Sequence, residues 1–291
     1  MANETVFTGL AHPTDVYGAG ISAALIKAVV LPPLIYSESL PVGTNLKNVK
    51  KLGNLTSSSG GVAEGANYTT LSQWTTTGVL VTTIKDVVST FTTVESMQFS
   101  PTDEALMVQE IGLALAREMD AEILAMFAGF ANLVTATSVL TIADVMDAAY
   151  TVRAAIKGAG GVRRLRAFLN HKGAHEIAKE IVASSASVFT IPSNNALFGE
   201  DPLVPNGYKG QVAGIEIYES SGHATTGGNN IQAVVDPGIA LAAVYGAGAE
   251  MLPPIWRGQG TVSFGVELSG LMWHGVSEWN DTAGCELQSD S

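Results

Sequence analysis

The clearest hydrophobic pattern in the chain lies just after residue 100. Ser100-Pro101-Thr102-Asp103 supplies a capping residue, a proline for the first helical turn and an acidic residue. Beyond it, apolar side chains recur every four residues, at Met107, Ile111, Leu115, Met119, Ile123 and Phe127. This spacing keeps them on one slowly drifting face of a helix. The pattern predicts a long amphipathic helix over residues 103–128, about 40 Å in length at a rise of about 1.5 Å per residue.

Three shorter helices are expected. Thr141-Ile142-Ala143-Asp144 is a capping sequence that predicts a helix to about residue 157, ended by Gly158. The spacing of Ile177 and Ile181 predicts another over residues 172–184. Residues 21–30 predict a short helix that stops before two prolines and docks its apolar face on a neighbour. This last stretch is shorter than the roughly 20 residues of a membrane span.

A two-stranded arm is predicted between residues 42 and 94. Residues 75–94 are dominated by Thr, Val and Ile, whose stiff branched side chains favour one long strand or a pair of strands. Residues 42–55 form a polar, strand-like stretch with three lysines, Lys47, Lys50 and Lys51. Residues 56–68 are rich in Ser, Gly and Thr and cannot build a core, so we expect a projecting mobile loop.

The second half of the chain alternates between further strands and turns. Residues 165–170 and 261–273 read as strands, and residues 239–245 are apolar. Residues 211–219 and 231–235 read as strands around a Gly-rich hairpin tip at 220–230. Strands and helices are segregated, without the regular alternation of a doubly wound sheet. The predicted fold class is therefore α+β.

Composition favours a subunit of an assembly. The 291 residues are 46% hydrophobic and 14% charged, whereas about a quarter of a typical soluble chain is charged. Such a chain has too few charges to cover an isolated monomer, so we expect it to bury much of its exterior against copies of itself. The 15 basic and 27 acidic residues give a net charge of −12, which lacks the basic footprint of a dedicated nucleic-acid binder.

No enzymatic chemistry is predicted. Among the histidines, only His171 and His175 have a spacing that suits a metal, and the segment that follows has Lys179 where a zinc-protease helix needs histidine. The sequence contains neither a phosphate-binding loop nor a nucleophile elbow. Cys285 is the single cysteine, so no disulfide forms within the chain. We therefore expect no catalytic, cofactor-binding or metal-binding residues.

Two groups of charged residues have structural interpretations. Glu118, Asp120 and Glu122 are expected to form a solvated helix flank or a contact with a neighbouring subunit, in preference to a catalytic pair. A third of the basic residues fall within fourteen positions, at Arg153, Lys157, Arg163, Arg164 and Arg166. The favoured interpretation is a basic seam that meets acidic surface on the next subunit. A solvated face and a DNA contact are the alternatives.

Several short segments, in this order, carry a family resemblance. They are Val62-Ala63-Glu64-Gly65-Ala66 in the predicted loop, Glu95-Ser96 before the long helix, Leu115 to Ala121 within it, Phe168-Leu169-Asn170-His171 before a later helix, and Gly210 to Ser220. In order and spacing, they resemble the major capsid proteins of tailed double-stranded-DNA bacteriophages along nearly the whole chain. That family shares the Hong Kong 97-type capsid fold.

The resemblance implies a domain organisation as well as a fold. It comprises an N-terminal arm, a peripheral domain that contains an extended loop and a spine helix, an axial domain, and return strands with a C-terminal tail. On this chain these parts correspond to residues 1–35, residues 36–139 with the loop at about 50–78 and the spine helix at about 103–128, residues 140–250, and residues 251–291.

The resemblance also implies a structural function. The chain would assemble with itself into hexamers and pentamers of an icosahedral phage head, built in the host cytoplasm, that encloses double-stranded DNA without sequence-specific binding. Further expected partners are portal and decoration proteins, with a separate scaffolding protein or none, because only about 35 residues precede the first strand. No membrane contact and no lysine cross-links are predicted. An encapsulin-type nanocompartment shell and a gene-transfer-agent capsid are the alternatives, and an enzyme or lectin-like module is the rival class.

Overall fold

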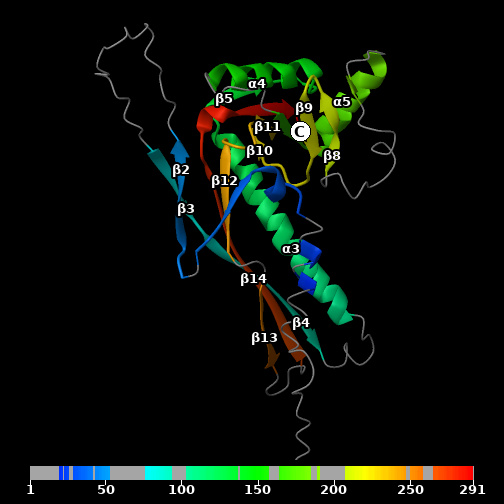
Figure 1. The fold of residues 1–291 in the computed structure, drawn as a ribbon. Helices are drawn as coiled ribbons and strands as arrows, with labels where there is room; N and C mark the ends of the chain where they lie inside the picture. The colour runs from blue at the N-terminus through cyan, green and yellow to red at the C-terminus, as the bar shows by residue number, and fades with distance from the viewer. Residues whose placement is uncertain are drawn as a thin grey trace, which may run out of the picture.

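The computed structural model of the chain has an elongated shape. Helix α3 (Asp103–Ala125) runs along an extended sheet, and its C-terminal end reaches a compact end of the molecule, which carries α4 (Ile142–Ala155) and α5 (His171–Ser184) (Figure 1). The structure describes residues 20–21, 23–25, 29–41, 43–52, 76–93, 103–136, 138–156, 164–184, 189–190, 207–246, 250–257 and 265–290.

The long helix predicted from the four-residue spacing is confirmed. It begins at Asp103, and its last turn is the 3₁₀ helix η2 (Met126–Gly129). Most of the predicted apolar face is buried, and Met107, near the start, is half-buried. The buried members are Ile111, Leu115, Met119, Ile123 and Phe127.

A five-stranded sheet lies along α3. Its central strand β14 (Gly265–Glu278) pairs antiparallel with β4 (Ile84–Thr93) on one edge. On the other edge it pairs with β12 (Leu241–Tyr245) and, further along, with β13 (Glu250–Arg257). The short strand β1 (Tyr36–Ser39) extends the sheet in parallel to β12. The long strand β14 therefore connects all the other parts of this sheet.

Strand alternation explains how this sheet holds the helix. Val266, Leu268 and Met272 of β14 point to the same face and pack against Ile111, Leu115 and Met119 of α3. Gly270 lies in the same row, where an added Cβ would be 2.5 Å from Cγ2 of Ile111. The glycine thus lets the helix approach the sheet closely.

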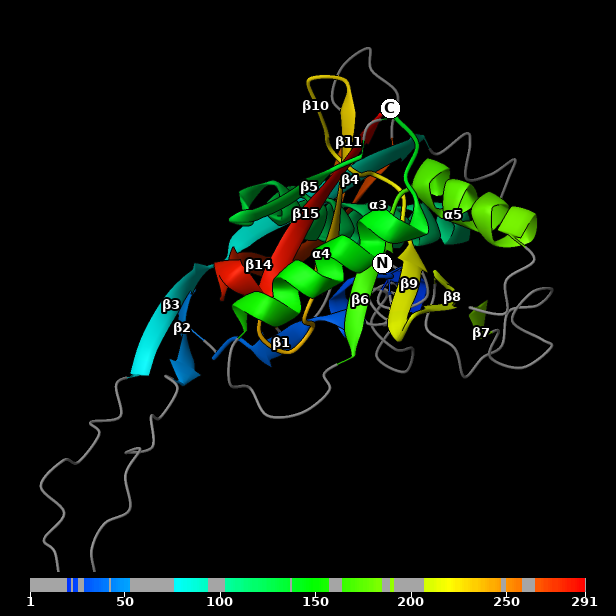
Figure 2. The ribbon, with the colours of Figure 1, turned by 90° about the horizontal axis from the view of Figure 1, so that it is seen from above.

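The compact end contains an eight-stranded sheet. Its strands follow the order β5-β15-β11-β6-β9-β8-β7, with β10 paired to β11. Helices α4 and α5 lie over one face (Figure 2), and the C-terminal end of α3 packs on the other. The strands are β5 (Asn132–Thr135), β6 (Leu165–Leu169), β7 (Phe189–Thr190), β8 (Tyr208–Val212), β9 (Ile215–Glu219), β10 (Thr225–Thr226), β11 (Asn229–Val235) and β15 (Gly284–Asp290).

Burial on both faces explains the composition of the inner strands. In β6, Leu165, Ala167 and Leu169 pack beneath the helices, while Phe168 points to the end of α3. Six of the seven residues of β11 are buried, as expected for a strand that is covered on two sides. These strands read as continuous apolar runs in the sequence for this reason.

The predicted two-stranded arm is confirmed at its base. Strands β2 (Leu46–Leu52) and β3 (Thr76–Thr82) pair antiparallel, and Val49 and Val81 pack on Ala242 and Val244 of β12. Because a lone hairpin is marginally stable in water, this contact with the five-stranded sheet holds the arm. Its predicted mobile tip, residues 56–68, lies outside the described residues.

Local helix signals were good predictors. The capping box of α4 forms as predicted: the backbone N–H of Asp144 donates to Oγ1 of Thr141, and the backbone N–H of Thr141 donates to Oδ2 of Asp144 at 2.9 Å. Helix α5 begins at His171, one residue before its predicted start. Residues 20–21 and 23–25 are helical, in agreement with the helix predicted over residues 21–30, but residues 29–30 are not, and the 3₁₀ helix η1 (Pro32–Leu34) follows.

Two predictions about the later strands are wrong. Residues 211–219 form two strands, β8 and β9, because Ala213 and Gly214 adopt positive φ angles of 48° and 81° in a tight turn. Strands β9 and β11 do not form a hairpin, since β6 lies between them and pairs with both. The local hairpin is β10–β11, with its turn at Gly227 and Gly228.

The domain boundaries at residues 139/140 and 250/251 stay a prediction. Strands from both sides of these boundaries pair with each other. In the eight-stranded sheet, β5 pairs with β15, and in the five-stranded sheet, β12 pairs with β14. Each sheet is therefore built from segments that are far apart in the sequence.

The packing of α3 yields a test of the helix–sheet contact. Met119 is 5% exposed and faces β14, so Met119→Asp would bury a carboxylate without a partner and cost about 3–5 kcal/mol of folding stability. We expect soluble, assembled protein to be lost, as measured by soluble yield and size-exclusion chromatography. Arg117→Asp, on the exposed side of the same helix, is the control. Normal assembly by the Met119 variant would contradict this placement.

Candidate assembly surfaces

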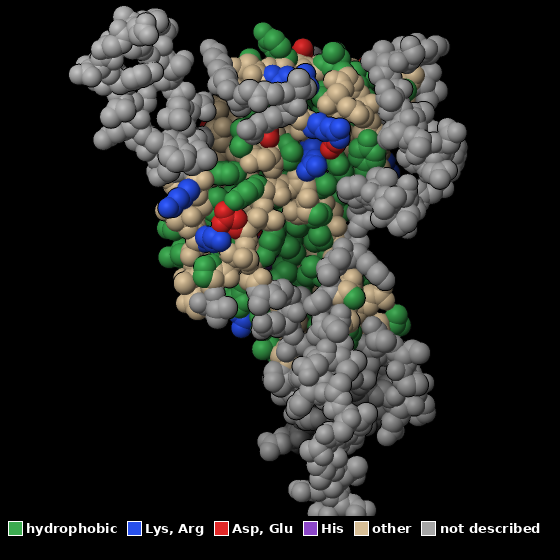
Figure 3. All heavy atoms as spheres, in the orientation of Figure 1, with side chains coloured by type: hydrophobic (Ala, Val, Ile, Leu, Met, Phe, Trp, Pro, Cys, Tyr) green, Lys and Arg blue, Asp and Glu red, His purple; other side chains and the backbone are tan. Residues whose placement is uncertain are grey.

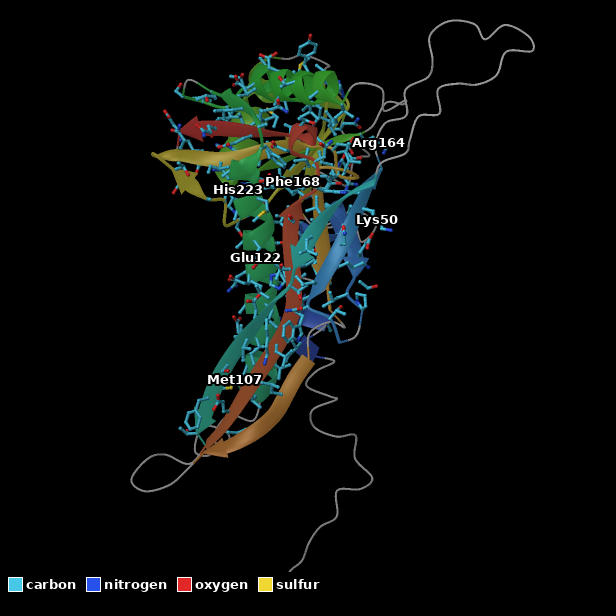
Figure 4. All side chains as sticks on the ribbon, turned by 90° about the vertical axis from the view of Figure 1, so that its left-hand side faces the viewer. Lys50, Met107, Glu122, Arg164, Phe168 and His223 are labelled. Carbon is cyan, nitrogen blue, oxygen red and sulfur yellow. The ribbon has the colours of Figure 1, made fainter. Side chains whose placement is uncertain are left out.

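The two-stranded arm exposes apolar side chains on one face. Val49 and Val81 face the five-stranded sheet, whereas Leu46 and Leu80 point the other way and are exposed, Leu80 by 59%. Lys47 lies 2.8 Å from Glu38 of β1, and Lys50 is exposed (Figure 4). The outer face of the arm is therefore available to another chain.

The five-stranded sheet exposes a second apolar surface on the side away from α3. Because β4 and β14 alternate, Val87 and Phe91 of β4 and Trp273 of β14 point away from the helix. Phe91 is 44% exposed, and the other two are exposed to a similar extent. We call Val87, Phe91 and Trp273 the outer sheet patch.

A third apolar surface lies on α4. Met146 and Tyr150, one turn apart, point away from the buried face formed by Val145 and Ala149. Tyr150 is 72% exposed. On the face of the molecule in Figure 3, charged side chains are scattered and hydrophobic atoms reach the surface between them. The low charge content predicts that apolar surface is left uncovered. The described residues show such surface at three separate places: the arm, the outer sheet patch and α4.

The basic cluster is divided between internal and external roles. Arg166 lies 3.1 Å from Glu216, donates to the backbone carbonyl of Leu34 and packs over the ring of Tyr218. For Arg166, the predicted intersubunit seam is therefore wrong, because the residue is used within the fold. The side chain of Arg164 is 81% exposed, and its distance to Glu216, 3.5 Å, is longer than that of Arg166 (Figure 4). Arg153 is also exposed, while Lys157 and Arg163 lie outside the described residues.

A row of aromatic rings joins the end of α3 to the eight-stranded sheet. Phe127 stacks on Phe168 of β6 with ring centroids 5.7 Å apart, and Phe168 packs on Tyr218 of β9 at 5.8 Å. Burial raises the pKa of Tyr218 to about 12, and the negative charge of Glu216 adds to this effect. The row carries no titratable group active near neutral pH, so its role is packing.

The acidic cluster on α3, predicted as a solvated flank or a contact with a neighbouring subunit, is divided, because Asp120 is used within the fold. Glu118 is exposed, but Asp120 is buried and accepts hydrogen bonds from the backbone N–H groups of Leu31, at 3.0 Å, and Val30, at 3.3 Å. Burial raises the pKa of Asp120 to about 6, although these two hydrogen bonds oppose the rise. Asp120 thus attaches the segment before β1 to the spine helix.

The histidines lie in different environments. His171 contacts Glu219, which also lies 2.6 Å from Lys209, and His175 is exposed, so the structure does not bring the two histidines together as metal ligands. His223 lies between the hydroxyl of Ser220 and the carbonyl of Ile231. No carboxylate supports that Ser–His pair in the described contacts, and its serine is 4% exposed, so it is a structural pair.

Sequence reasoning missed the most buried of the described histidines. His274 of β14 is fully buried and lies between Asp86 of β4 and Glu122 of α3. These three residues are far apart in the sequence and show no motif spacing, so no local signal reveals them.

Cys285 is also buried, and burial raises the pKa of its thiol to about 11. This thiol is therefore unreactive near neutral pH.

In the described part of the chain, no helix is both long and apolar enough to cross a membrane. The described elements instead combine a long helix along one sheet, a β-arm beside it, and a second, helix-covered sheet at one end. This combination is the Hong Kong 97-type capsid fold, and solved structures of shell-building proteins share it.

Three solved structures illustrate this likeness. The capsid protein of Ralstonia phage GP4 has a TM-score of 0.65 and 9% identity, over 89% of this chain and 87% of that one. The capsid of an empty gene-transfer-agent particle has a TM-score of 0.59 and 13% identity, over 100% and 94%. The SrpI encapsulin of Synechococcus elongatus PCC 7942 has a TM-score of 0.56 and 12% identity, over 89% and 87%. Neither a model of a protein family nor a curated protein sequence matches this chain.

The environment of Asp120 predicts a pH-dependent stability. The pKa of Asp120 is higher in the folded protein than in the unfolded chain. The stability that the protonated Asp120 gives to the folded state is therefore complete below about pH 4, and it is lost as the pH rises through about 6. The free energy of unfolding should therefore fall by on the order of 2 kcal/mol relative to Asp120→Asn between pH 4 and pH 7.5. Denaturant unfolding of the unassembled subunit at several pH values measures this difference. Glu118→Gln should show no such trend, and a constant difference for the Asp120 variant would refute the assignment.

Proposed function

We propose that this chain is a major capsid protein that assembles into the hexamers and pentamers of an icosahedral phage head. The observation that carries the proposal is a capsid fold with apolar surface exposed at three separate places: the arm, the outer sheet patch and α4. A monomer rarely leaves such surfaces open without a use for them. Contacts between different surfaces of identical subunits can close into rings and shells.

The charge of the chain is compatible with the enclosure of DNA without sequence-specific binding. The net charge of −12 repels phosphate, so the shell wall would not hold the genome tightly. Among the described residues of the compact end, Arg153, Arg164, Lys172, Lys179 and Lys209 are exposed basic residues. In this proposal the mature location is the virion, after assembly in the host cytoplasm.

The other partners follow from the same function. Portal and decoration proteins would contact the assembled shell, and a separate scaffolding protein, if one is used, would direct its assembly. Two shell types with the same fold are the alternatives: an encapsulin-type nanocompartment, which encloses cargo protein, and a gene-transfer-agent capsid. The likeness in fold extends to structures of all three types, so the contents of the particle must separate them.

The test is negative-stain electron microscopy of the purified protein, combined with size-exclusion chromatography and light scattering. Uniform closed shells, or discrete five- and six-subunit rings, would support the proposal. Nucleic acid inside the shells would favour a phage or gene-transfer-agent capsid, and a co-purified enzyme would favour an encapsulin. A stable monomer that never assembles, even when phage lysate supplies a scaffold, would refute it.

The outer sheet patch should be required for assembly but not for folding. Phe91→Asp replaces an apolar ring that is partly open to solvent, so the subunit should fold while an interface loses apolar burial. We expect a loss of roughly 1–3 kcal/mol per interface, seen as a shift from shells to small oligomers in light scattering. Thr226→Asp, at the exposed β10 hairpin, is the control. Unchanged shell yield for Phe91→Asp would exclude this patch from the subunit contacts.

A further inference from the structure

His274, Asp86 and Glu122 converge from three elements between α3 and the five-stranded sheet. In the register of β4 and β14, Asp86 pairs with Met272, and Ile84 pairs with His274. Asp86 and His274 therefore point to the same face of adjacent strands, the face that packs against α3. Glu122, labelled in Figure 4, reaches them from the last turn of that helix. One ligand atom from each of the three side chains lies within 4.8 Å of the others.

The histidine is held between the two carboxylates. Its Nδ1 lies 3.0 Å from Oδ2 of Asp86, and its Nε2 lies 2.9 Å from Oε2 of Glu122. The side chain of His274 has no exposed surface, while the two acidic side chains are 21% and 22% exposed. The cluster thus has a closed inner side, formed by the imidazole, and an outer side formed by two partly exposed acidic side chains.

These short distances are not hydrogen bonds. Neither ring nitrogen of His274 has a hydrogen-bond partner in the structure, and Oδ2 of Asp86 has none either. The carboxylate oxygens therefore lie close to the nitrogens but away from the direction in which an N–H group would point. Buried polar atoms that lack a partner are rare, and each one calls for an explanation.

Metal coordination is compatible with the spacing of the ligand atoms. Two neighbouring ligands of one metal ion, each bonded at about 2.0–2.2 Å, lie about 3 Å or slightly more apart. Because the lone pairs of Nδ1 and Nε2 point apart, one ion is bound by only one of the two ring nitrogens, together with the two carboxylates.

The charge of the cluster also favours a cation. With a neutral imidazole, the two carboxylates carry two negative charges in a partly buried site, which is costly without compensation. Among the described residues, no lysine or arginine forms an ion pair with Asp86 or Glu122. A divalent ion cancels this charge, and one nitrogen with two oxygens is a ligand set that zinc accepts.

We propose that Asp86, Glu122 and His274 bind a divalent metal ion of the zinc class, with water at the remaining coordination positions. The ion links α3, β4 and β14 within one subunit, and it stabilises the folded state because the unfolded chain lacks the assembled site. The proposal adds a site where the sequence predicts none. It is independent of the proposed shell function, because all three ligands belong to one chain.

The experiment measures metal in the purified full-length protein. The protein is treated with a chelator, dialysed against Zn²⁺ and then against metal-free buffer, and its metal content is determined by elemental mass spectrometry. We expect retention of about one ion per subunit and a higher melting temperature with Zn²⁺ than without it. Co²⁺ replaces Zn²⁺ as a spectroscopic probe, and a visible absorption band typical of low-coordinate cobalt with a nitrogen ligand is expected.

Near-isosteric variants identify the ligands. Asp86→Asn and Glu122→Gln should each weaken Zn²⁺ binding by roughly tenfold or more and reduce the cobalt band. Two controls should bind as the wild type does: Glu118→Gln, exposed on the same helix, and His171→Gln, which removes the surface His–Glu contact. Circular dichroism checks that each variant is folded.

The proposal is overturned if the wild-type protein retains no ion and shows no cobalt band. It is equally overturned if folded Asp86→Asn and Glu122→Gln bind Zn²⁺ as tightly as the two controls do, because the metal then lies elsewhere. The cobalt spectrum of the wild type decides the question even where a variant fails to fold.

Discussion

The structure depends on burial of one apolar helix face against two different sheets. The first part of the α3 face, from Ile111 to Met119, packs on the five-stranded sheet, and the last part, from Ile123 to Phe127, enters the core beneath the eight-stranded sheet. Each sheet alone leaves a hydrophobic face open, and the helix covers both in succession. It thereby sets the distance and angle between the two sheets.

The elements that the sequence predicts are those with local causes. The four-residue spacing along α3 and the Thr141–Asp144 capping box each depend on neighbours within a turn or two, so the pattern is readable without the fold. The β-branched run that became β3 and β4 is similar, because stiff side chains favour strands locally. The general fold also followed from the order of such elements, through their resemblance to phage capsid proteins.

The parts that the sequence does not predict depend on register and on contacts between distant segments. The turn at Ala213 was hidden because β8 and β9 both carry buried residues and read as one run. The partners of Asp120 and Glu122 were missed for a similar reason, since Leu31 and His274 are far from them in the chain. Helical spacing predicts which side chains share a face, but it does not predict which distant residues that face contacts.

Strand β15 has a consequence for the order of synthesis. It lies inside the eight-stranded sheet, between β5 and β11, although its residues are the last that the structure describes. Until residues 284–290 leave the ribosome, the edges of β5 and β11 stay unpaired, and open strand edges invite pairing with other chains. A nascent subunit therefore cannot complete its compact end early, and growing chains on one messenger are exposed to premature association until this strand is inserted.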